Sequence, residues 1–159
     1  MQKILRLHQI ISRFDGLITV WIGSLLSLAI RLWVGHDFFL SGVEKLRDWS
    51  ATLALFHDEY HVPVLPPDLA AYIGAAGELG FPILLAFGLI SRPAAIGLFF
   101  VNAMAVISYP QLFQFDCPAG IKDHIRWGLM ALVIFAYGPG RISLDYLLER
   151  MRAKVGMST

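Results

Sequence analysis

Ionisable and amide side chains interrupt the longest apolar stretches of this sequence, and they are its candidates for chemistry. Four of them can donate and accept protons and are the candidate catalytic residues: His36, Asp37, Glu78 and His124. Four others can hold a polar group or offset a charge and are the candidate binding residues: Arg31, Lys45, Asn102 and Arg126. A charged group inside a membrane segment costs about 2.5 kcal/mol or more, so it faces protein or water and indicates a functional site.

The composition predicts that the elements carrying these residues lie in a membrane. Hydrophobic residues make up 57% of the 159 residues, and the mean hydropathy is +0.62. A hydrocarbon core of about 30 Å needs about 20 mostly apolar residues for each helical span. The chain has room for four spans, which we expect at residues 17–41, 68–90, 94–109 and 121–137. The expected fold class is therefore all-α, an integral membrane four-helix bundle that forms a single domain over residues 1–159.

Shorter helices are expected outside the spans. Apolar residues recur at helical spacing within residues 1–14 and again within residues 49–60, as is typical of helices that lie on a membrane surface. The first pattern predicts an interfacial helix at the N-terminus, and the second a short amphipathic helix in the first outer loop. The motif GPGRISLD, residues 138–145, stops the fourth span, and Ser143 is a candidate cap for an interfacial C-terminal helix.

The distribution of cations predicts the orientation of the spans. Most Lys and Arg residues lie near the two ends of the chain or in the turn after the second span, and the positive-inside rule then puts both termini in the cytoplasm. The formal net charge is only +1 and no long basic tract occurs, so the expected partner is the lipid bilayer and not nucleic acid. The lipid-facing positions do not distinguish a monomer from a dimer.

Depth along the spans indicates which side chains meet. Spans that alternate in direction put Arg31 and Glu78 near the midplane, and put Asp37 level with Arg126 in the outer half. From depth alone we expect the pairs Arg31 with Glu78 and Arg126 with Asp37, around a polar pocket in the outer half. Helical spacing also defines an inward face of the first span, made of Arg31, Gly35, Phe38, Gly42 and Lys45.

Three segments of the chain are similar to motifs that occur together in one family of membrane proteins. RLWVGHDFFLSGVEKL, residues 31–46, resembles the family's first-helix signature, in which an arginine is followed by a glycine and a small-G-x-x-K-L ending. GELGFPILLAFGLISRPAA, residues 77–95, is similar in its central acid, its L-x-x-G-L run and its arginine in the turn. GPGRISLD is close to the family's G-x-G-R-x-S-L-D ending. By the order and spacing of these three segments, the chain resembles the DoxX family of small bacterial inner-membrane proteins.

The resemblance implies a multi-pass, four-helix protein of the bacterial inner (cytoplasmic) membrane. Relatives in that family include a subunit of thiosulfate:quinone oxidoreductase and membrane partners of thiol and superoxide-detoxifying proteins, which implies a redox role and a redox protein partner. The sequence shows no haem-binding motif, no paired cysteines and no flavin fingerprint. Electron transfer would therefore need a diffusible quinone or a partner's cofactor, and no covalently bound cofactor is expected.

Two functions are open from the sequence. In the first, the protein is a redox-associated membrane component whose outer-half pocket holds a quinone headgroup. His36 or His124 would then hydrogen-bond a carbonyl of the quinone, and Asp37 or Glu78 would relay protons. Arg31 and Arg126 would stabilise the developing negative charge. In the second, the protein is a non-catalytic scaffold or a small-solute handler, its charges hold the helices together, and its outer loop recruits partners.

Two further features have simpler interpretations. His57 and His61 are four residues apart but lack the third ligand of a typical catalytic zinc site, so no metal is expected. Cys117 is the single cysteine, which excludes an intrachain disulfide. It is either without a role or forms a mixed disulfide with a partner on the outer side.

Overall fold

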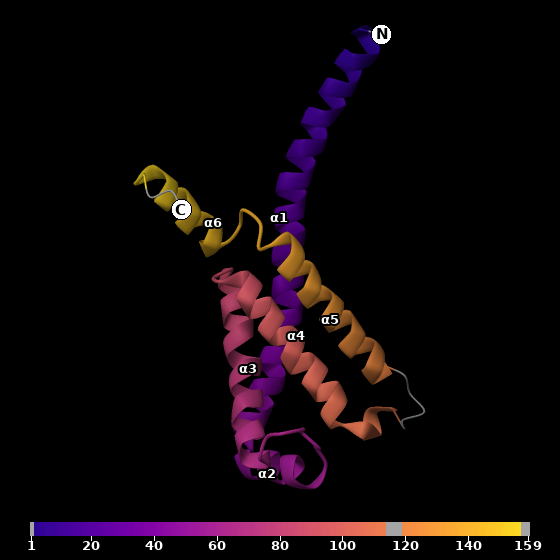
Figure 1. Cartoon of the computed structure of the whole chain (residues 1–159), viewed down its shortest axis with the longest axis vertical. Helices are drawn as coiled ribbons and strands as arrows, with labels where there is room; N and C mark the ends of the chain where they lie inside the picture. Colours follow the sequence, from indigo (N-terminus) through magenta and orange to yellow (C-terminus); the bar gives the residue numbers. More distant parts are fainter. Residues whose placement is uncertain (1, 114–118, 157–159) are drawn as a thin grey trace.

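The computed structural model describes residues 2–113 and 119–156, and this part of the chain is helical without strands. Its helices in chain order are α1 (Gln2–Arg47), α2 (Trp49–Asp58), α3 (Pro67–Phe87), α4 (Ser91–Ser108), the short 3-10 helix η1 (Pro110–Phe113), α5 (Ala119–Tyr137) and α6 (Leu144–Lys154). Figure 1 shows α3, α4 and α5 beside the C-terminal half of α1, with α2 at one end of the bundle and α6 at the other. The predicted all-α fold class is confirmed.

Within residues 2–113 and 119–156, three helical segments have the length and composition to cross a membrane: Ile18–Arg47 of α1, α3 and α4. The predicted membrane protein with transmembrane helices is thereby supported. α5 has 19 residues, but Lys122, Asp123 and Arg126 lie in its first turns, and it is not among these three. The described part of the chain therefore supports three spans, and a fourth at residues 121–137 stays a prediction.

The interfacial helix predicted for residues 1–14 and the span predicted for residues 17–41 form one helix, α1, of 46 residues. No proline occurs between residues 2 and 47, so nothing in the sequence removes a backbone hydrogen bond there. At 1.5 Å per residue α1 is about 69 Å long, more than twice the thickness of a hydrocarbon core. Part of α1 must extend beyond the bilayer, and Figure 1 shows its N-terminal part reaching away from the other helices.

The predicted inward face of α1 packs against α3. All five residues of this face are buried or partly buried. Two glycines allow the close approach: a Cβ built on Gly35 would lie 3.5 Å from the carbonyl oxygen of Pro82, and one built on Gly42 would lie 2.8 Å from Cγ of Leu79. Larger residues at these positions would push α1 and α3 apart.

The apolar core lies where α1, α3, α4 and α5 meet, and its largest fully buried members are Val34, Leu85, Leu98 and Ile134. Large apolar side chains also remain exposed around the outside of the bundle. Trp33 is 53% exposed and Phe100 is 65% exposed. Helices that are apolar on both their inner and outer faces are typical of a bilayer environment, because lipid contacts the outer apolar side chains, whose exposure to water would cost free energy.

α2 confirms the short amphipathic helix predicted between the first two spans. Asp48 caps its start, since its Oδ1 atom accepts a hydrogen bond from the backbone N–H of Ala51 at 2.9 Å. This hydrogen bond lowers the pKa of Asp48 below its ordinary value of 3.8. The apolar face of α2 packs on the start of α3, where His57 Nε2 lies 2.8 Å from Asp68 Oδ1.

The GPGRISLD motif forms the turn between α5 and α6. Gly138 and Gly140 have φ angles of 83° and 76°, a backbone conformation that glycine adopts without strain. Ser143 then caps α6 as predicted, because its Oγ atom accepts a hydrogen bond from the backbone N–H of Tyr146 at 3.2 Å. The turn carries the chain across the end of the bundle.

Candidate functional site

Asn102 of α4 and His124 of α5 are joined by two hydrogen bonds. Asn102 Nδ2 donates to the backbone carbonyl of His124 at 2.9 Å, and Asn102 Oδ1 lies 2.8 Å from His124 Nδ1. Because a carbonyl only accepts, the amide nitrogen of Asn102 must face it and the amide oxygen must face the imidazole ring. His124 Nδ1 therefore carries the proton, and in the neutral ring Nε2 is left as an acceptor.

Trp127 links this pair to α1. Its indole ring meets the His124 ring edge-on, with the ring centroids 5.1 Å apart. Its Nε1 atom donates a hydrogen bond to Asp37 Oδ2 at 2.9 Å. His36 Nδ1 lies 3.3 Å from the other carboxylate oxygen of Asp37, and the His36 side chain is 67% exposed. Asp37, Asn102, His124 and Trp127 thus form one network across three helices, which we call the outer polar network.

Sequence reasoning missed Trp127. It lies three residues after His124, so the two side chains share one face of α5, and this spacing was the available signal. An indole N–H is only a donor and needs an acceptor when it is buried. Asp37, whose side chain is 27% exposed, is the acceptor that α1 supplies.

The predicted pair of Arg126 with Asp37 is wrong. Arg126 Nη2 lies 3.1 Å from Asp123 Oδ1 on its own helix, and the Arg126 guanidinium lies 5.5 Å from the centre of the Trp33 ring. Adjacent residues on a helix point about 100° apart, so when Trp127 faces Asp37, Arg126 points away from Asp37 and toward the exposed Trp33 of α1.

The predicted pair of Arg31 with Glu78 is also wrong, because Glu78 pairs with Lys45. Lys45 Nζ lies 2.7 Å and 2.9 Å from the two carboxylate oxygens of Glu78, and it donates to Ser41 Oγ at 3.0 Å. Gly42 of α1 lies against Glu78 and so fixes the register of α1 and α3. Arg31 is 14 residues from Lys45 along α1, a distance of about 21 Å, and is out of reach.

Arg31 is fully buried and bonds to backbone carbonyls. Its Nη1 atom donates to the carbonyl of Leu85 at 2.9 Å and its Nη2 atom donates to the carbonyl of Ile142 at 2.6 Å. The end of α3 beside it finishes at Gly88, where φ is 67°. Arg31 thereby ties α1 to the end of α3 and to the turn that precedes α6.

Asp145 completes the contacts at this end of the bundle. Its carboxylate accepts hydrogen bonds from the backbone N–H groups of Ile90 and Ser91, at 2.7 Å and 2.9 Å, and from Ser91 Oγ at 2.8 Å. Its own backbone N–H donates to the carbonyl of Gly88 at 2.9 Å. The side chain of Asp145 thus caps the start of α4, and it holds α6 against the turn between α3 and α4.

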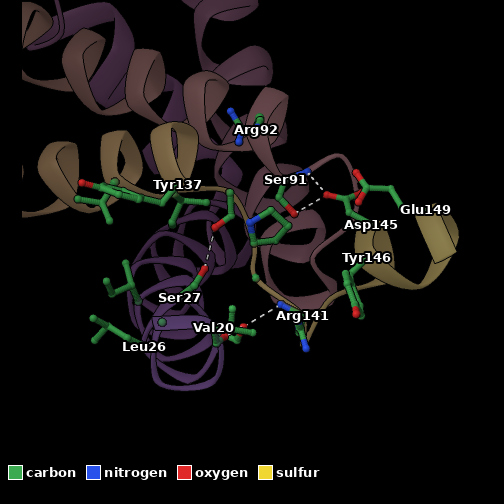
Figure 2. A pocket seen from close by; sticks show the side chains of 18 of the residues that line it. Val20, Leu26, Ser27, Ser91, Arg92, Tyr137, Arg141, Asp145, Tyr146 and Glu149 are labelled. Carbon is green, nitrogen blue, oxygen red and sulfur yellow. Dashed lines mark hydrogen bonds between the residues drawn. The ribbon is translucent and has the colours of Figure 1, made fainter. Parts of the chain in front are cut away.

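Two grooves lie on the surface of the bundle near these contacts. One, of about 390 Å³, lies between α1 and α5 and is lined by Ile30, Lys122, Ile125, Arg126, Leu129, Met130 and Val133. The other, of about 970 Å³, lies at the end of the bundle where the turn before α6 crosses α1 and α4 (Figure 2). The first is apolar apart from its two cations, while arginine, serine and carboxylate side chains line the second. Cys117 lies outside the described residues.

Comparisons with known proteins identify one matching family. The DoxX family model matches residues 26–110, which include the first two of the three motif segments. An uncharacterized protein of Haemophilus influenzae is 31% identical over 136 residues, and the matched region covers 82% of this chain and 88% of that protein. No solved structure matches the chain.

Proposed function

Since the chain belongs to the DoxX family, we propose that it is a quinone-linked component of the bacterial inner membrane, with both termini in the cytoplasm. The observation that carries this proposal is the fixed orientation of His124. Asn102 holds the proton on Nδ1, so Nε2 of the neutral ring is an acceptor. A quinol hydroxyl supplies the hydrogen bond that this acceptor needs.

The neighbouring residues extend this role. Asp37 is partly exposed and already accepts a hydrogen bond from Trp127, so its carboxylate can pass a proton toward the exposed imidazole of His36. The apolar groove between α1 and α5 runs along the helix that carries His124 and suits an isoprenoid tail. A redox protein that exchanges electrons with the quinone belongs to the same proposal.

Binding of a short-tailed quinol to the purified protein under reducing conditions tests the proposal. Decylubiquinol, whose hydroxyl groups can donate to Nε2, should change the fluorescence of the protein, and Trp127→Phe should remove the part of the change that comes from the outer polar network. His124→Phe should weaken binding about tenfold, the loss expected for one hydrogen bond worth about 1.4 kcal/mol. His61→Gln, an exposed histidine outside the network, is the matched control. Equal binding by the His124 and His61 variants would contradict the proposal.

A second candidate function is supported by the charges that lie outside the network. Arg31 and the Lys45–Glu78 pair bond within the protein and join helices together. In this alternative the chain is a non-catalytic scaffold, or a handler of a small solute, and it recruits partners through its outer loop. A folded protein that neither carries nor binds quinone would favour the scaffold.

A further inference from the structure

The groove at the α6 end of the bundle is lined by apolar side chains, which we call its floor, and by basic side chains. Its floor includes Ile18, Ile22 and Leu26 of α1 and Val133 of α5. Along α1 the lining extends from Ile18 to residue 30, a length of about 18 Å. One leaflet of a hydrocarbon core is about 15 Å thick, so the floor is long enough to hold most of an acyl chain.

Three arginines line this groove: Arg92, Arg141 and Arg152. Among the side chains that the structure describes, none of these guanidinium groups lies within 4.0 Å of a carboxylate. Figure 2 shows Arg141 and Tyr146 on the same side of the groove. A guanidinium without a carboxylate partner keeps its planar N–H donors available for a phosphate.

Arg141 is positioned by its neighbours. Its guanidinium carbon lies 5.7 Å from the centre of the Trp21 ring and 5.8 Å from the centre of the Tyr146 ring. Its backbone N–H donates to Ser24 Oγ at 2.9 Å. Contacts with aromatic ring faces leave the edge of the guanidinium free, and that edge is the part that binds phosphate oxygens.

The acidic side chains of the groove do not cancel this charge. Asp145 already accepts three hydrogen bonds from the start of α4, where the helix dipole also offsets its charge. Glu149 is the other acid in the lining. Among the described residues that line the groove, three arginines therefore face one carboxylate that is not otherwise engaged.

We propose that this groove binds an anionic phospholipid, with its phosphate at Arg141 and one acyl chain between α1 and α5. Nearby arginines attract an anionic headgroup, and the apolar floor adds the burial of the chain. No residue of the outer polar network lines this groove, so the phosphate site at Arg141 does not depend on quinone binding. The apolar part of the groove meets the groove proposed for the isoprenoid tail at Ile30 and Val133.

Native mass spectrometry and thermal unfolding of the full chain in detergent test this site. Phosphatidylglycerol is compared with phosphatidylcholine of the same acyl chains, and inorganic phosphate is added alone in a third sample. We expect phosphatidylglycerol to bind at least about tenfold more tightly than phosphatidylcholine and to raise Tm. Arg141→Gln should remove this preference. Arg47→Gln, an exposed arginine at the other end of α1, should keep it.

A second variant separates the headgroup from the chain. Leu26→Trp fills the apolar floor and leaves every arginine in place, so it should weaken binding of phosphatidylglycerol while the protein stays folded. Equal binding of the two lipids would overturn the proposal. A preference that persists in Arg141→Gln would also overturn it, as would a Tm increase from inorganic phosphate as large as that from phosphatidylglycerol.

Discussion

Lys45 of α1 and Glu78 of α3 form an ion pair whose side chains are only 15% and 10% exposed. The ammonium nitrogen contacts both carboxylate oxygens and also donates to Ser41. In a pair this shielded from solvent each charge needs the other, because either charge alone would stay buried without compensation. The pair therefore ties α1 to α3 and is expected to matter more for stability than for chemistry.

Removal of one member of this pair should cost more than removal of both. Glu78→Gln leaves the Lys45 ammonium uncompensated and should lower the free energy of unfolding by about 3 kcal/mol. The double variant Lys45→Met with Glu78→Met should recover most of that loss. Unfolding in mixed detergent and dodecyl sulfate micelles measures both changes. Glu44→Gln, which removes the exposed partner of Arg47, should change stability by less than about 1 kcal/mol. A double variant that is less stable than Glu78→Gln would show that the pair is not the source of the loss.

Gly88 should not tolerate a side chain. It adopts φ of 67°, and a Cβ there would overlap the guanidinium of Arg31 and approach Cβ of Ser143 to 2.5 Å. Gly88→Ala is therefore expected to cost more than about 1 to 2 kcal/mol, the penalty of the left-handed backbone alone. Gly80→Ala is the matched control, because nothing lies within 4 Å of a Cβ at that helical position, and it should gain up to about 1 kcal/mol. Similar Tm values for the two variants would refute the close contact between Arg31 and Gly88.

The hydrogen bonds of Asn102 should set the tautomer of His124. Nitrogen NMR of labelled imidazole should show the Nδ1-protonated neutral form in the wild-type protein. Asn102→Leu leaves Nδ1–H without its acceptor, which should cost about 1 to 3 kcal/mol and shift the ring toward a mixture of tautomers. Observation of the Nε2-protonated tautomer in the wild-type protein would contradict the hydrogen-bond assignment and the acceptor role proposed for Nε2.

The carboxylate of Asp145 should hold α6 on the bundle. Asp145→Ala removes three hydrogen bonds to the start of α4, so amide exchange at Ile90, at Ser91 and throughout α6 should accelerate about tenfold or more. Glu149→Ala alters a neighbouring acid that has no such bonds in the described structure, and it should leave exchange in the turn between α3 and α4 unchanged. Unaltered exchange in Asp145→Ala would mean that α6 is held by other contacts.

Acid should weaken the start of α2. Asp48 has a lowered pKa in the folded protein because its carboxylate accepts the hydrogen bond from Ala51. The stabilisation is therefore complete above the ordinary pKa of 3.8 and is lost as pH falls through the lower folded-state value. Amide exchange at Ala51, corrected for its intrinsic pH dependence, should gain an acid-dependent acceleration below about pH 4. Asp48→Asn keeps a cap oxygen without the charge and should lack this dependence.

Local patterns in the sequence predicted the fold well. Helical spacing identified the face that contains Gly35 and Gly42, because one helix determines which of its own residues share a side. Ser143 was predicted as a cap because capping depends on residues only three positions apart. The absence of proline before residue 47 is an equally local signal, and it is consistent with one continuous α1. The sequence instead predicts two helices in this segment, because its composition changes near residue 16.

Contacts between helices were harder to predict. Depth alone matched Arg31 with Glu78, yet the register of α1 and α3 depends on how Gly42 packs against Leu79, which periodicity does not give. Arg31 instead binds backbone carbonyls of residues 85 and 142, and no side-chain pattern marks a carbonyl as a partner. The rotation of α5 that turns Trp127 toward Asp37 is likewise set by packing.

The most direct test of quinone linkage is the quinone content of the protein purified from the bacterial membrane that produces it. Lipid extracts of the wild-type protein, of His124→Phe and of His61→Gln are compared by mass spectrometry at equal amounts of folded protein. The proposal predicts quinone in near-equimolar amount with the wild-type and His61→Gln proteins and at least about tenfold less with His124→Phe. Wild-type protein that is folded and carries no more quinone than His124→Phe would contradict it.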